Sequence, residues 1–408
     1  MATRRRVRGA YCPTGIIHLA AVDNRAGMKL ACAAKPGELE LKKEAIADII
    51  WSGSSTRFLG GNLVKCRMVE QGYEMGDCLV ELPNRKKKRA CEAALRQEDD
   101  TLHRIIEAAH LSRPEHYLSI YQSGCNHNCK KCHSWQFSQS VKGEWYSTDQ
   151  IADLARKYER YVTYWEPRER ATMWHATDLC RSCGQCVIKG QSSAFCPGVL
   201  DPQQVILSPQ GFGPARNIVA FTGGDIACRA DFYAQATEKI KTRCWNMWVL
   251  LETNGYGLTA ENLDILAQAG LDAFWLDIKA YDEELYHKLC GTTNEWILKA
   301  PAEILKRDFV LEVLTLFIPG WVETDQIEHI AGLICQLDAN VPFTILAFFP
   351  AFLMADTPRP TLSQMLEAYF AVKKVGLRNV KLGNYSVFAQ TDEDWDKLLA
   401  TVGQAGIG

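Results

Sequence analysis

The sequence has no long apolar run, no marked excess of charge of either sign, no internal repeat and no low-complexity tract. Crossing a membrane takes about 20 consecutive apolar residues, so we expect no transmembrane helix. Lys and Arg number 46 and Asp and Glu number 48, a net charge of −2. This balance argues against nucleic acid as a partner, because dedicated nucleic-acid binders carry a basic excess. No apolar stretch follows the basic first residues, so we expect no secretory signal and a cytoplasmic location.

Cysteine, in contrast, is abundant, with 16 in 408 residues. A secreted disulfide scaffold would be shorter and denser in cysteine, whereas clustered cysteines in a reducing compartment indicate metal binding. The hydrophobic share of 47% is ample for a core. The length suits two or three domains, or one barrel with additions. We predict an N-terminal accessory block (1–112), a first barrel strand with a cysteine loop (113–139), an insertion (140–214) and the rest of the barrel (215–408).

Short β-rich segments alternate with helical ones from Tyr117 onward. The predicted strands are Tyr117–Gln122, Ile218–Phe221, Trp248–Glu252, Phe274–Asp277, Leu311–Phe317, Phe343–Phe348 and Val380–Leu382. Helices are predicted at Gln97–Leu111, Asp149–Tyr161, Asp231–Thr242, Ala260–Ala269, Asp325–Leu337 and Leu362–Lys374. Such alternation indicates a parallel sheet, which right-handed crossovers can curl. We therefore predict an α/β fold, a partial (β/α)6-type TIM barrel with functional residues at the carboxyl ends of its strands.

Three cysteines with the spacing C-x3-C-x2-C follow the first predicted strand. They are Cys125, Cys129 and Cys132. Three thiolates can hold three irons of a cubane cluster, which leaves the fourth iron with the open position that a catalytic metal needs. A structural zinc site completed by His127 or His133 is one alternative, and a chance spacing is another. We predict a catalytic iron–sulfur site.

At these residues the chain resembles the radical S-adenosylmethionine (SAM) superfamily, whose signature is C-x3-C-x2-C. Three later motifs occur in that superfamily's order, namely Phe221-Thr-Gly-Gly-Asp225, Glu252-Thr-Asn-Gly-Tyr256 and Asp277-Ile-Lys279. The segments CHSWQFSQ, DIKAYDEELYHKLCGT and LEVLTLFIPG look like the branch of glycyl-radical-enzyme activases and AmmeMemoRadiSam enzymes. The resemblance covers Tyr117–Gln139 and Ile218–Phe388. It implies a partial TIM barrel and reductive cleavage of SAM to a 5′-deoxyadenosyl radical.

The resemblance also implies the residues around SAM. The main-chain carbonyls of Gly223 and Gly224 are expected to receive the SAM ammonium, because glycine lets the backbone approach a ligand closely. Asp225 stands where the family usually has Glu, which shortens the reach of that carboxylate.

Two further pairs of residues complete this expectation. Thr253 and Asn254 are expected near the ribose and the carboxylate of SAM. Asp277 and Lys279 lie two residues apart and point the same way, so that Lys279 can pair with the SAM carboxylate. The predicted cofactor-binding set is Thr222, Gly223, Gly224, Asp225, Glu252, Thr253, Asn254, Asp277 and Lys279.

A second set of cysteines lies in the insertion with the spacing C-x2-C-x2-C-x9-C-P. Its members are Cys180, Cys183, Cys186 and Cys196. The pattern resembles the bacterial ferredoxin run, although the last gap is longer than the usual three residues. Four ligands would saturate a second 4Fe-4S cluster, which would be auxiliary and serve electron relay or substrate anchoring. Zinc or a single iron is the alternative. The larger activases have eight cysteines here, so four are a departure.

The other cysteines show no tight spacing. We expect buried free thiols at Cys12, Cys32, Cys66, Cys78 and Cys91, with a folded site that uses several of them as the alternative. Cys228, Cys244, Cys290 and Cys335 are expected to be packing residues. Cys228, three residues after the Thr-Gly-Gly-Asp motif, is also a candidate hydrogen donor.

The resemblance to activases implies a protein or peptide substrate and a reductant such as ferredoxin or flavodoxin, under anaerobic conditions. Our first prediction is a post-translational C-methyltransferase whose N-terminal block helps to hold cobalamin. It rests on an analogy with the cobalamin-dependent radical SAM enzymes that methylate methyl-coenzyme M reductase in methanogens. The usual cobalamin motif, D-x-H-x-x-G, is absent. A glycyl-radical-enzyme activase is the alternative, and a non-catalytic iron–sulfur electron carrier is a further one.

Overall fold

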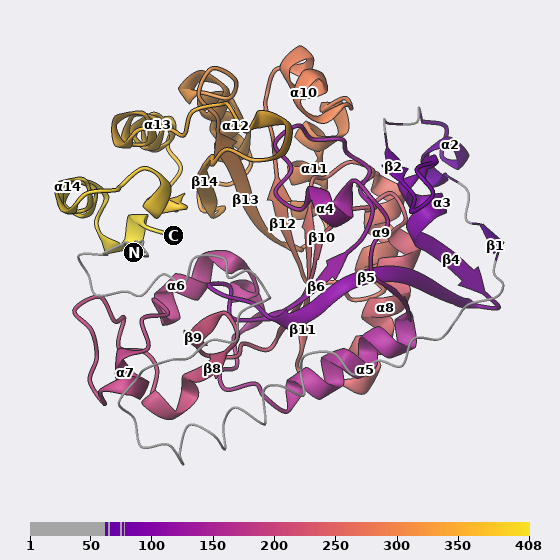
Figure 1. Cartoon of the computed structure of the whole chain (residues 1–408), viewed down its shortest axis with the longest axis horizontal. Coiled ribbons are helices and arrows are strands. Elements are labelled where there is room, and N and C mark those ends of the chain that lie inside the picture. Colours follow the sequence, from indigo (N-terminus) through magenta and orange to yellow (C-terminus); the bar gives the residue numbers. More distant parts are fainter. Residues whose placement is uncertain (1–61, 64–65, 74–75, 77) are drawn as a thin grey trace, which may run out of the picture.

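The computed structural model describes residues 62–63, 66–73, 76 and 78–408. Within them, an eleven-stranded sheet forms the centre of the molecule (Figure 1). Seven neighbouring strands run parallel in the order β6, β10, β11, β12, β13, β14 and β15. Their bounds are Leu118–Gln122, Ile218–Gly223, Trp248–Thr253, Ala273–Asp277, Val310–Phe317, Phe343–Ala347 and Val380–Gly383. Strand β15 does not pair with β6 in the described residues, so the predicted partial barrel is confirmed.

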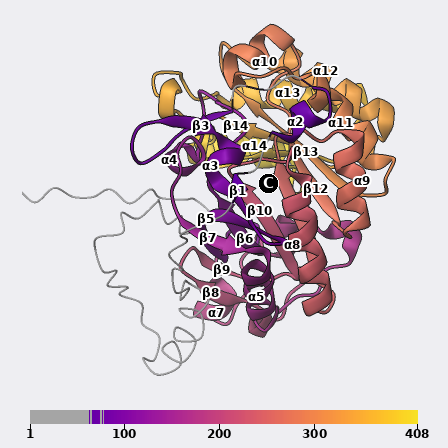
Figure 2. The ribbon, with the colours of Figure 1, turned by 90° about the vertical axis from the view of Figure 1, so that its right-hand side faces the viewer.

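Helices join the successive parallel strands and pack along the sheet. They are α5 (Thr148–Glu159), α8 (Ala230–Arg243), α9 (Ala260–Gln268), α10 (Glu283–Cys290), α11 (Glu295–Leu305), α12 (Thr324–Leu337) and α13 (Leu362–Val375), followed by α14 (Asp392–Val402). Figure 2 shows α5 and α8 side by side. Helix α5 begins with a capping box in which the Gln150 amide N–H donates to Ser147 Oγ at 3.1 Å and the Ser147 N–H donates to Gln150 Oε1 at 2.8 Å. Thr361 and Gln364 repeat this cap on α13.

Antiparallel strands extend the sheet beyond β6. Strand β5 (Thr101–Leu111) pairs with β6, with β4 (Leu95–Glu98) and with β7 (Glu144–Ser147), and β1 (Asn62–Leu63) pairs with β4. The helix predicted at residues 97–111 is therefore wrong. Leu102, Ile105 and Ile106 have helical spacing, but a strand buried on both faces gives the same apolar density. A turn at Asp99, with φ of 49°, folds β4 back onto β5.

A small unit precedes this edge of the sheet. It consists of α2 (Arg67–Glu70), the hairpin of β2 (Leu79–Glu81) and β3 (Lys87–Arg89), and α3 (Ala90–Ala94). Residues 1–61, with Cys12 and Cys32, lie outside the described residues. Among the residues that are described, no helix has both the length and the apolar composition that crossing a bilayer requires.

The segment between α5 and β10 covers the inner face of the sheet. It contains η1 (Arg168–Arg170), η2 (Met173–His175), α6 (Ala176–Leu179), α7 (Gln185–Ile188) and the hairpin of β8 (Ile206–Ser208) and β9 (Gly211–Gly213). Ala171 and Met173 pack against Ile218, Leu250 and neighbouring inward residues near the strand starts. Figure 1 shows this segment on the side of the molecule opposite β1 to β4. The carboxyl ends of the strands, where the predicted site residues lie, belong to the other end of the sheet.

Candidate active site

The three cysteines of the C-x3-C-x2-C motif lie in the loop between β6 and α4 (Trp135–Ser138). Cys125 and Cys129 are buried and Cys132 is half-buried. The Cys132 N–H donates to the Cys129 carbonyl oxygen at 3.2 Å, and Cys132 Sγ lies 3.0 Å from Ser138 Oγ. The loop thus presents its thiols at the carboxyl end of the first parallel strand, where the sequence predicted them.

The loop lies directly on the end of β10. The Asn126 N–H donates to the Asp225 carbonyl oxygen at 2.7 Å. A Cβ at Gly224 would lie 2.4 Å from the Gly124 carbonyl oxygen, so only glycine allows this approach. The buried Arg104 donates from Nη2 to the Gly224 carbonyl oxygen at 2.8 Å. A carbonyl oxygen has two lone pairs. The bond from Arg104 occupies one lone pair of the Gly224 carbonyl, which we assigned to the SAM ammonium.

Asp225 joins the ends of β10 and β11. Its carboxylate accepts hydrogen bonds from Thr253 Oγ1 at 2.7 Å, from the Asn254 N–H at 2.8 Å and from the Ala227 N–H at 2.7 Å. Burial raises the pKa of Asp225 in spite of these donors. The side chain therefore positions the turn after β11, a task that the sequence did not reveal.

Asn254 and Asn126 connect that turn to the cysteine loop. Asn254 Nδ2 donates to Asn126 Oδ1 at 2.7 Å and lies 3.7 Å from Cys125 Sγ. Asn126 Nδ2 donates in turn to the Tyr256 carbonyl oxygen at 3.0 Å. Sequence reasoning missed Asn126, although its place directly after Cys125 was a usable signal.

Lys279 and Asp277 point the same way, as their spacing predicted, and form a half-buried ion pair with each other beside Cys129. The predicted partner of Lys279 was the SAM carboxylate. Burial lowers the pKa of Lys279, but the charges of Asp277 and Cys129 raise it by more, so the ammonium stays charged. Lys131, which the sequence analysis passed over inside the cysteine motif, interacts electrostatically with Lys279 and with the same loop. Two ammonium groups next to the thiols suit an anionic ligand group such as a carboxylate.

Thr222 and Glu252 form a separate polar group on the inner face of the sheet. Tyr117 donates from its hydroxyl to Glu252 Oε1 at 2.9 Å, and Thr222 Oγ1 donates to Glu252 Oε2 at 2.5 Å. Burial raises the pKa of Glu252 to about 8. These contacts connect the start of β6 to the carboxyl ends of β10 and β11.

His127 is held by neighbours on both sides of its ring. Its Nδ1 lies 3.1 Å from Asn126 Oδ1, and its Nε2 lies 2.9 Å from the Tyr286 hydroxyl and 3.2 Å from Thr292 Oγ1. Burial, followed by the charge of Lys279, lowers its pKa to about 3. Since both ring nitrogens are engaged, His127 does not serve as the fourth ligand of the zinc alternative.

Cys290 adds a thiol that the sequence analysis assigned to packing. It is buried at the end of α10 and hydrogen-bonds to Cys129, which raises the pKa of Cys129 together with burial. The Asn128 N–H donates to the Cys290 carbonyl oxygen at 2.9 Å. The cysteine loop is thus attached to α10 as well as to β10 and β11.

The four cysteines of the second set share one region around α7, and all four are half-buried. Burial raises the pKa of Cys186, and the charges of Cys183 and Cys196 raise it further, which places these side chains within electrostatic reach of one another. In the described part of the chain no three His, Cys, Asp or Glu side chains stand ready to ligate one metal ion. Thiolates of a cubane cluster bind different irons, so the auxiliary cluster stays a prediction.

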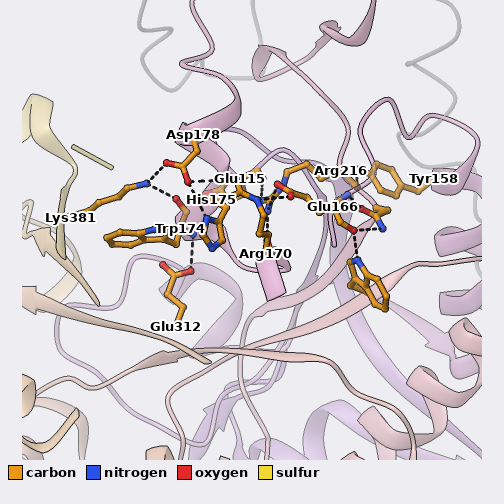
Figure 3. A network of polar contacts seen from close by, with 12 residues as sticks. Glu115, Tyr158, Glu166, Arg170, Trp174, His175, Asp178, Arg216, Glu312 and Lys381 are labelled. Atoms are coloured by element: carbon orange, nitrogen blue, oxygen red, sulfur yellow. Dashed lines mark hydrogen bonds and ion pairs between the residues drawn. The ribbon is translucent and has the colours of Figure 1, made fainter. Parts of the chain in front are cut away.

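A polar network attaches the segment before Cys180 to the sheet (Figure 3). The Trp174 N–H donates to Glu312 Oε2 on β13 at 2.8 Å. Lys381 on β15 donates to the Trp174 carbonyl oxygen at 2.7 Å and to Asp178 Oδ1 at 3.0 Å. Farther along, Glu166 forms an ion pair with Arg170 at 2.9 Å. The insertion is therefore fixed to two parallel strands just before its first cysteine.

Comparison with known proteins agrees with this arrangement. The family model described as the radical SAM superfamily matches residues 181–334, a range that contains the strand-end motifs of β10, β11 and β12. Over this range the chain is similar to the radical SAM superfamily. That superfamily implies a 4Fe-4S cluster and SAM, and three thiols beside a glycine-lined strand end fit that pair. Burial raises the pKa of Cys125 and of Cys132, so binding of the cluster must release protons.

Several individual proteins are similar to this chain. A protein of Methanocaldococcus jannaschii named as a glycyl-radical enzyme activating enzyme is 29% identical over 154 residues, 37% of this chain and 57% of the relative. The chain thus spans less than two thirds of that relative. A domain of pyruvate-formate lyase-activating enzyme from Bacteroides vulgatus is 17% identical, with a TM-score of 0.36 over 41% of this chain and 98% of that one. Streptococcus suis SuiB bound to S-adenosylmethionine is 11% identical, with a TM-score of 0.41 over 71% and 54%.

Proposed function

We propose that the chain uses a 4Fe-4S cluster on Cys125, Cys129 and Cys132, together with SAM, to abstract a hydrogen atom from a protein or peptide, as a glycyl-radical-enzyme activase does. The observation that supports this most is the joint between the cysteine loop and the strand ends. Short hydrogen bonds connect the Asp225 carboxylate, Asn254 and Asn126 at the ends of β10 and β11, and Asn254 lies 3.7 Å from Cys125 Sγ. A cluster on the loop would therefore be held against the residues that we assign to SAM.

Different residues of the chain would bind different groups of SAM. The Gly223 and Gly224 backbone would lie against its ammonium, and Lys279 and Lys131 would face its carboxylate. Thr253 and Asn254 would be oriented by Asp225. When bound, the cluster and SAM supply a primary carbon radical that removes hydrogen from an unactivated carbon.

The preference for an activase over a methyltransferase comes from the named relative. The Methanocaldococcus jannaschii protein is named as an activating enzyme. The block that we expected to help hold cobalamin lies largely in residues 1–61, outside the described part. Methyl transfer is therefore supported only by the analogy from which it was predicted.

The experiment is SAM cleavage by protein purified and reconstituted without oxygen, with dithionite as the reductant. The wild type should form 5′-deoxyadenosine and hold about eight irons, from two four-iron clusters. Cys125→Ala should hold about four and form none. Cys335→Ala, a half-buried thiol on α12, is the matched control and should equal the wild type. An iron-loaded wild type that leaves SAM intact would refute the proposal and favour an electron carrier.

A corrinoid assay separates the two enzymatic functions. The protein is mixed with hydroxocobalamin, desalted and analysed for cobalt. No retained cobalt is expected from an activase. About one cobalt per chain would contradict the activase proposal and return methyl transfer to first place.

A further inference from the structure

Four cysteines from distant parts of the sequence line one small cavity beside the cysteine loop. They are Cys66, Cys78, Cys91 and Cys228. Asn126 and Tyr256 form the wall toward the loop. Three of these cysteines come from the unit that precedes the sheet, and the fourth comes from the turn between β10 and α8. None of them belongs to the two cysteine sets described above.

Local structure fixes each thiol on a separate element. Cys66 is the N-cap residue of α2, Cys91 lies in α3, and Cys78 directly precedes β2. The Ala90 N–H donates to the Cys78 carbonyl oxygen at 2.8 Å. Cys228 faces Gly257, where a Cβ would lie 2.5 Å from that of Cys228. The backbone around the cavity is thus closely packed, and the side chains that meet there are thiols.

The thiols around the cavity contact one another and one charged neighbour. The Cys66 and Cys91 thiols hydrogen-bond to each other. Burial raises the pKa of Cys78 and of Cys228. Arg89 Nη1, at 3.3 Å from Cys78 Sγ, is the charged partner of that thiol. Packing alone would explain one buried thiol, but it does not explain four around a common space.

The size of the cavity limits what it can hold. Its volume is about 10 Å³, close to the space of one water-sized sphere. That suits one ion and is too small for a cubane of four irons and four sulfides. Four thiolates around one ion are the usual ligands of structural zinc, with tetrahedral geometry.

We propose that Cys66, Cys78, Cys91 and Cys228 bind a single zinc ion that attaches residues 66–94 to the barrel. The proposal is independent of the function proposed above. No three metal-binding side chains in the described residues already stand in position to ligate one ion, so the four sulfurs would close on the zinc by rotation of their side chains. The ion would adjoin Asn126, whose side chain bonds to Tyr256 and Asn254. Zinc would therefore support the cysteine loop through Asn126.

The test is zinc analysis of full-length protein purified without oxygen and without added metal. The background is Cys183→Ser, which removes zinc that the second cysteine set could hold. In that background we expect about one zinc per chain, with X-ray absorption showing four sulfurs at about 2.3 Å. Adding Cys78→Ser or Cys228→Ser should remove the zinc, whereas adding Cys335→Ser should leave it.

Two measurements keep the test decisive if a variant folds poorly. The absorption spectrum needs only the Cys183→Ser protein, and thiol mapping by mass spectrometry needs only the wild type. Absence of zinc, a zinc that survives both Cys78→Ser and Cys228→Ser, or a Cys66–Cys91 disulfide would each overturn the proposal. Iron in place of zinc at this site would do so as well.

Discussion

Lys381 on the last parallel strand donates its ammonium to the Trp174 carbonyl oxygen at 2.7 Å. The same group donates to Thr177 Oγ1 at 2.9 Å and to Asp178 Oδ1 at 3.0 Å, and it lies over the Trp174 ring at 4.3 Å. One side chain, almost fully buried, thus holds both η2 and α6. The position of the second cysteine set relative to the sheet depends on it.

Lys381→Met should loosen the insertion. The substitution removes the donor to a buried carbonyl oxygen and to Oδ1 of Asp178, whose Oδ2 keeps its contact with His175, and this costs about 2 to 3 kcal/mol. The midpoint of urea unfolding should fall, and limited trypsin digestion should cleave after Arg181 or Lys189 faster than in the wild type. Lys373→Met is the control, since Lys373 on α13 makes an exposed bond to the Arg378 carbonyl oxygen. Equal digestion of the two variants would contradict the assigned role.

Gly224→Ala should disrupt the cysteine loop. The added Cβ would lie 2.4 Å from the Gly124 carbonyl oxygen and 2.7 Å from that of Gln122, so the backbone around Cys125 must shift. Iron bound after reconstitution should drop by about four per chain, the content of one cubane. Gly332→Ala on α12 is the matched control, because the nearest atom to the added Cβ is 4.0 Å away. In this variant the free energy of unfolding should rise by up to about 1 kcal/mol. Full iron in Gly224→Ala would show that the loop tolerates the methyl group.

Arg104→Met tests the buried guanidinium. Arg104 Nη2 donates to the carbonyl oxygens of Ser123 and Gly124, each at 3.3 Å, and of Gly224 at 2.8 Å. Its removal leaves these acceptors unpaired in the core, at a cost of about 3 kcal/mol. Arg104→Lys, which can satisfy one of them, should recover part of the loss. Unfolding in urea measures both variants, and no difference between Met and Lys would mean that shape rather than hydrogen bonding matters there.

Glu252 should make stability depend on pH. Burial raises its pKa from 4.5 to about 8, so between these values the folded chain holds a proton that the unfolded chain has lost. Stability should therefore fall as pH rises from about 4.5 to 8, by at most about 1.4 kcal/mol per pH unit from this group. Glu252→Gln, a permanent neutral analogue, should flatten the profile of unfolding free energy. The exposed Glu238→Gln on α8 should leave the slope unchanged, and an unchanged slope in Glu252→Gln would refute the assignment.

The sequence predicted the parallel half of the fold well. Every parallel strand was found with its ends shifted by a residue or two, because such strands are continuous apolar runs bounded by turn residues. Helices α10, α11 and α14 were not predicted. Pro301 lies inside α11 and suggests an interruption, although tertiary packing carries the helix through it. The error at residues 97–111 arose because a buried strand and a helix give the same short-range spacing.

The sequence predicted the positions of the motif residues in the candidate site better than the hydrogen bonds between them. The motif residues at the ends of β6, β10, β11 and β12 lie where the sequence indicated. Their hydrogen bonds could not be predicted, because Asn126, Arg104 and Cys290 reach the site from positions that no spacing links to it. The meeting of Cys66 with Cys228 is the extreme case, since 161 residues separate them along the chain.

Strand β6 is hydrogen-bonded on both sides, to β5 and to β10. In an open barrel the first parallel strand would be an edge, exposed to pairing with other chains. Here the antiparallel extension makes it an interior strand. The amide hydrogens of β6 should therefore exchange with solvent only when a large part of the sheet opens. The strand that carries the cysteine loop is thus one of the most persistent elements of the sheet, and its edges are closed to pairing with other chains.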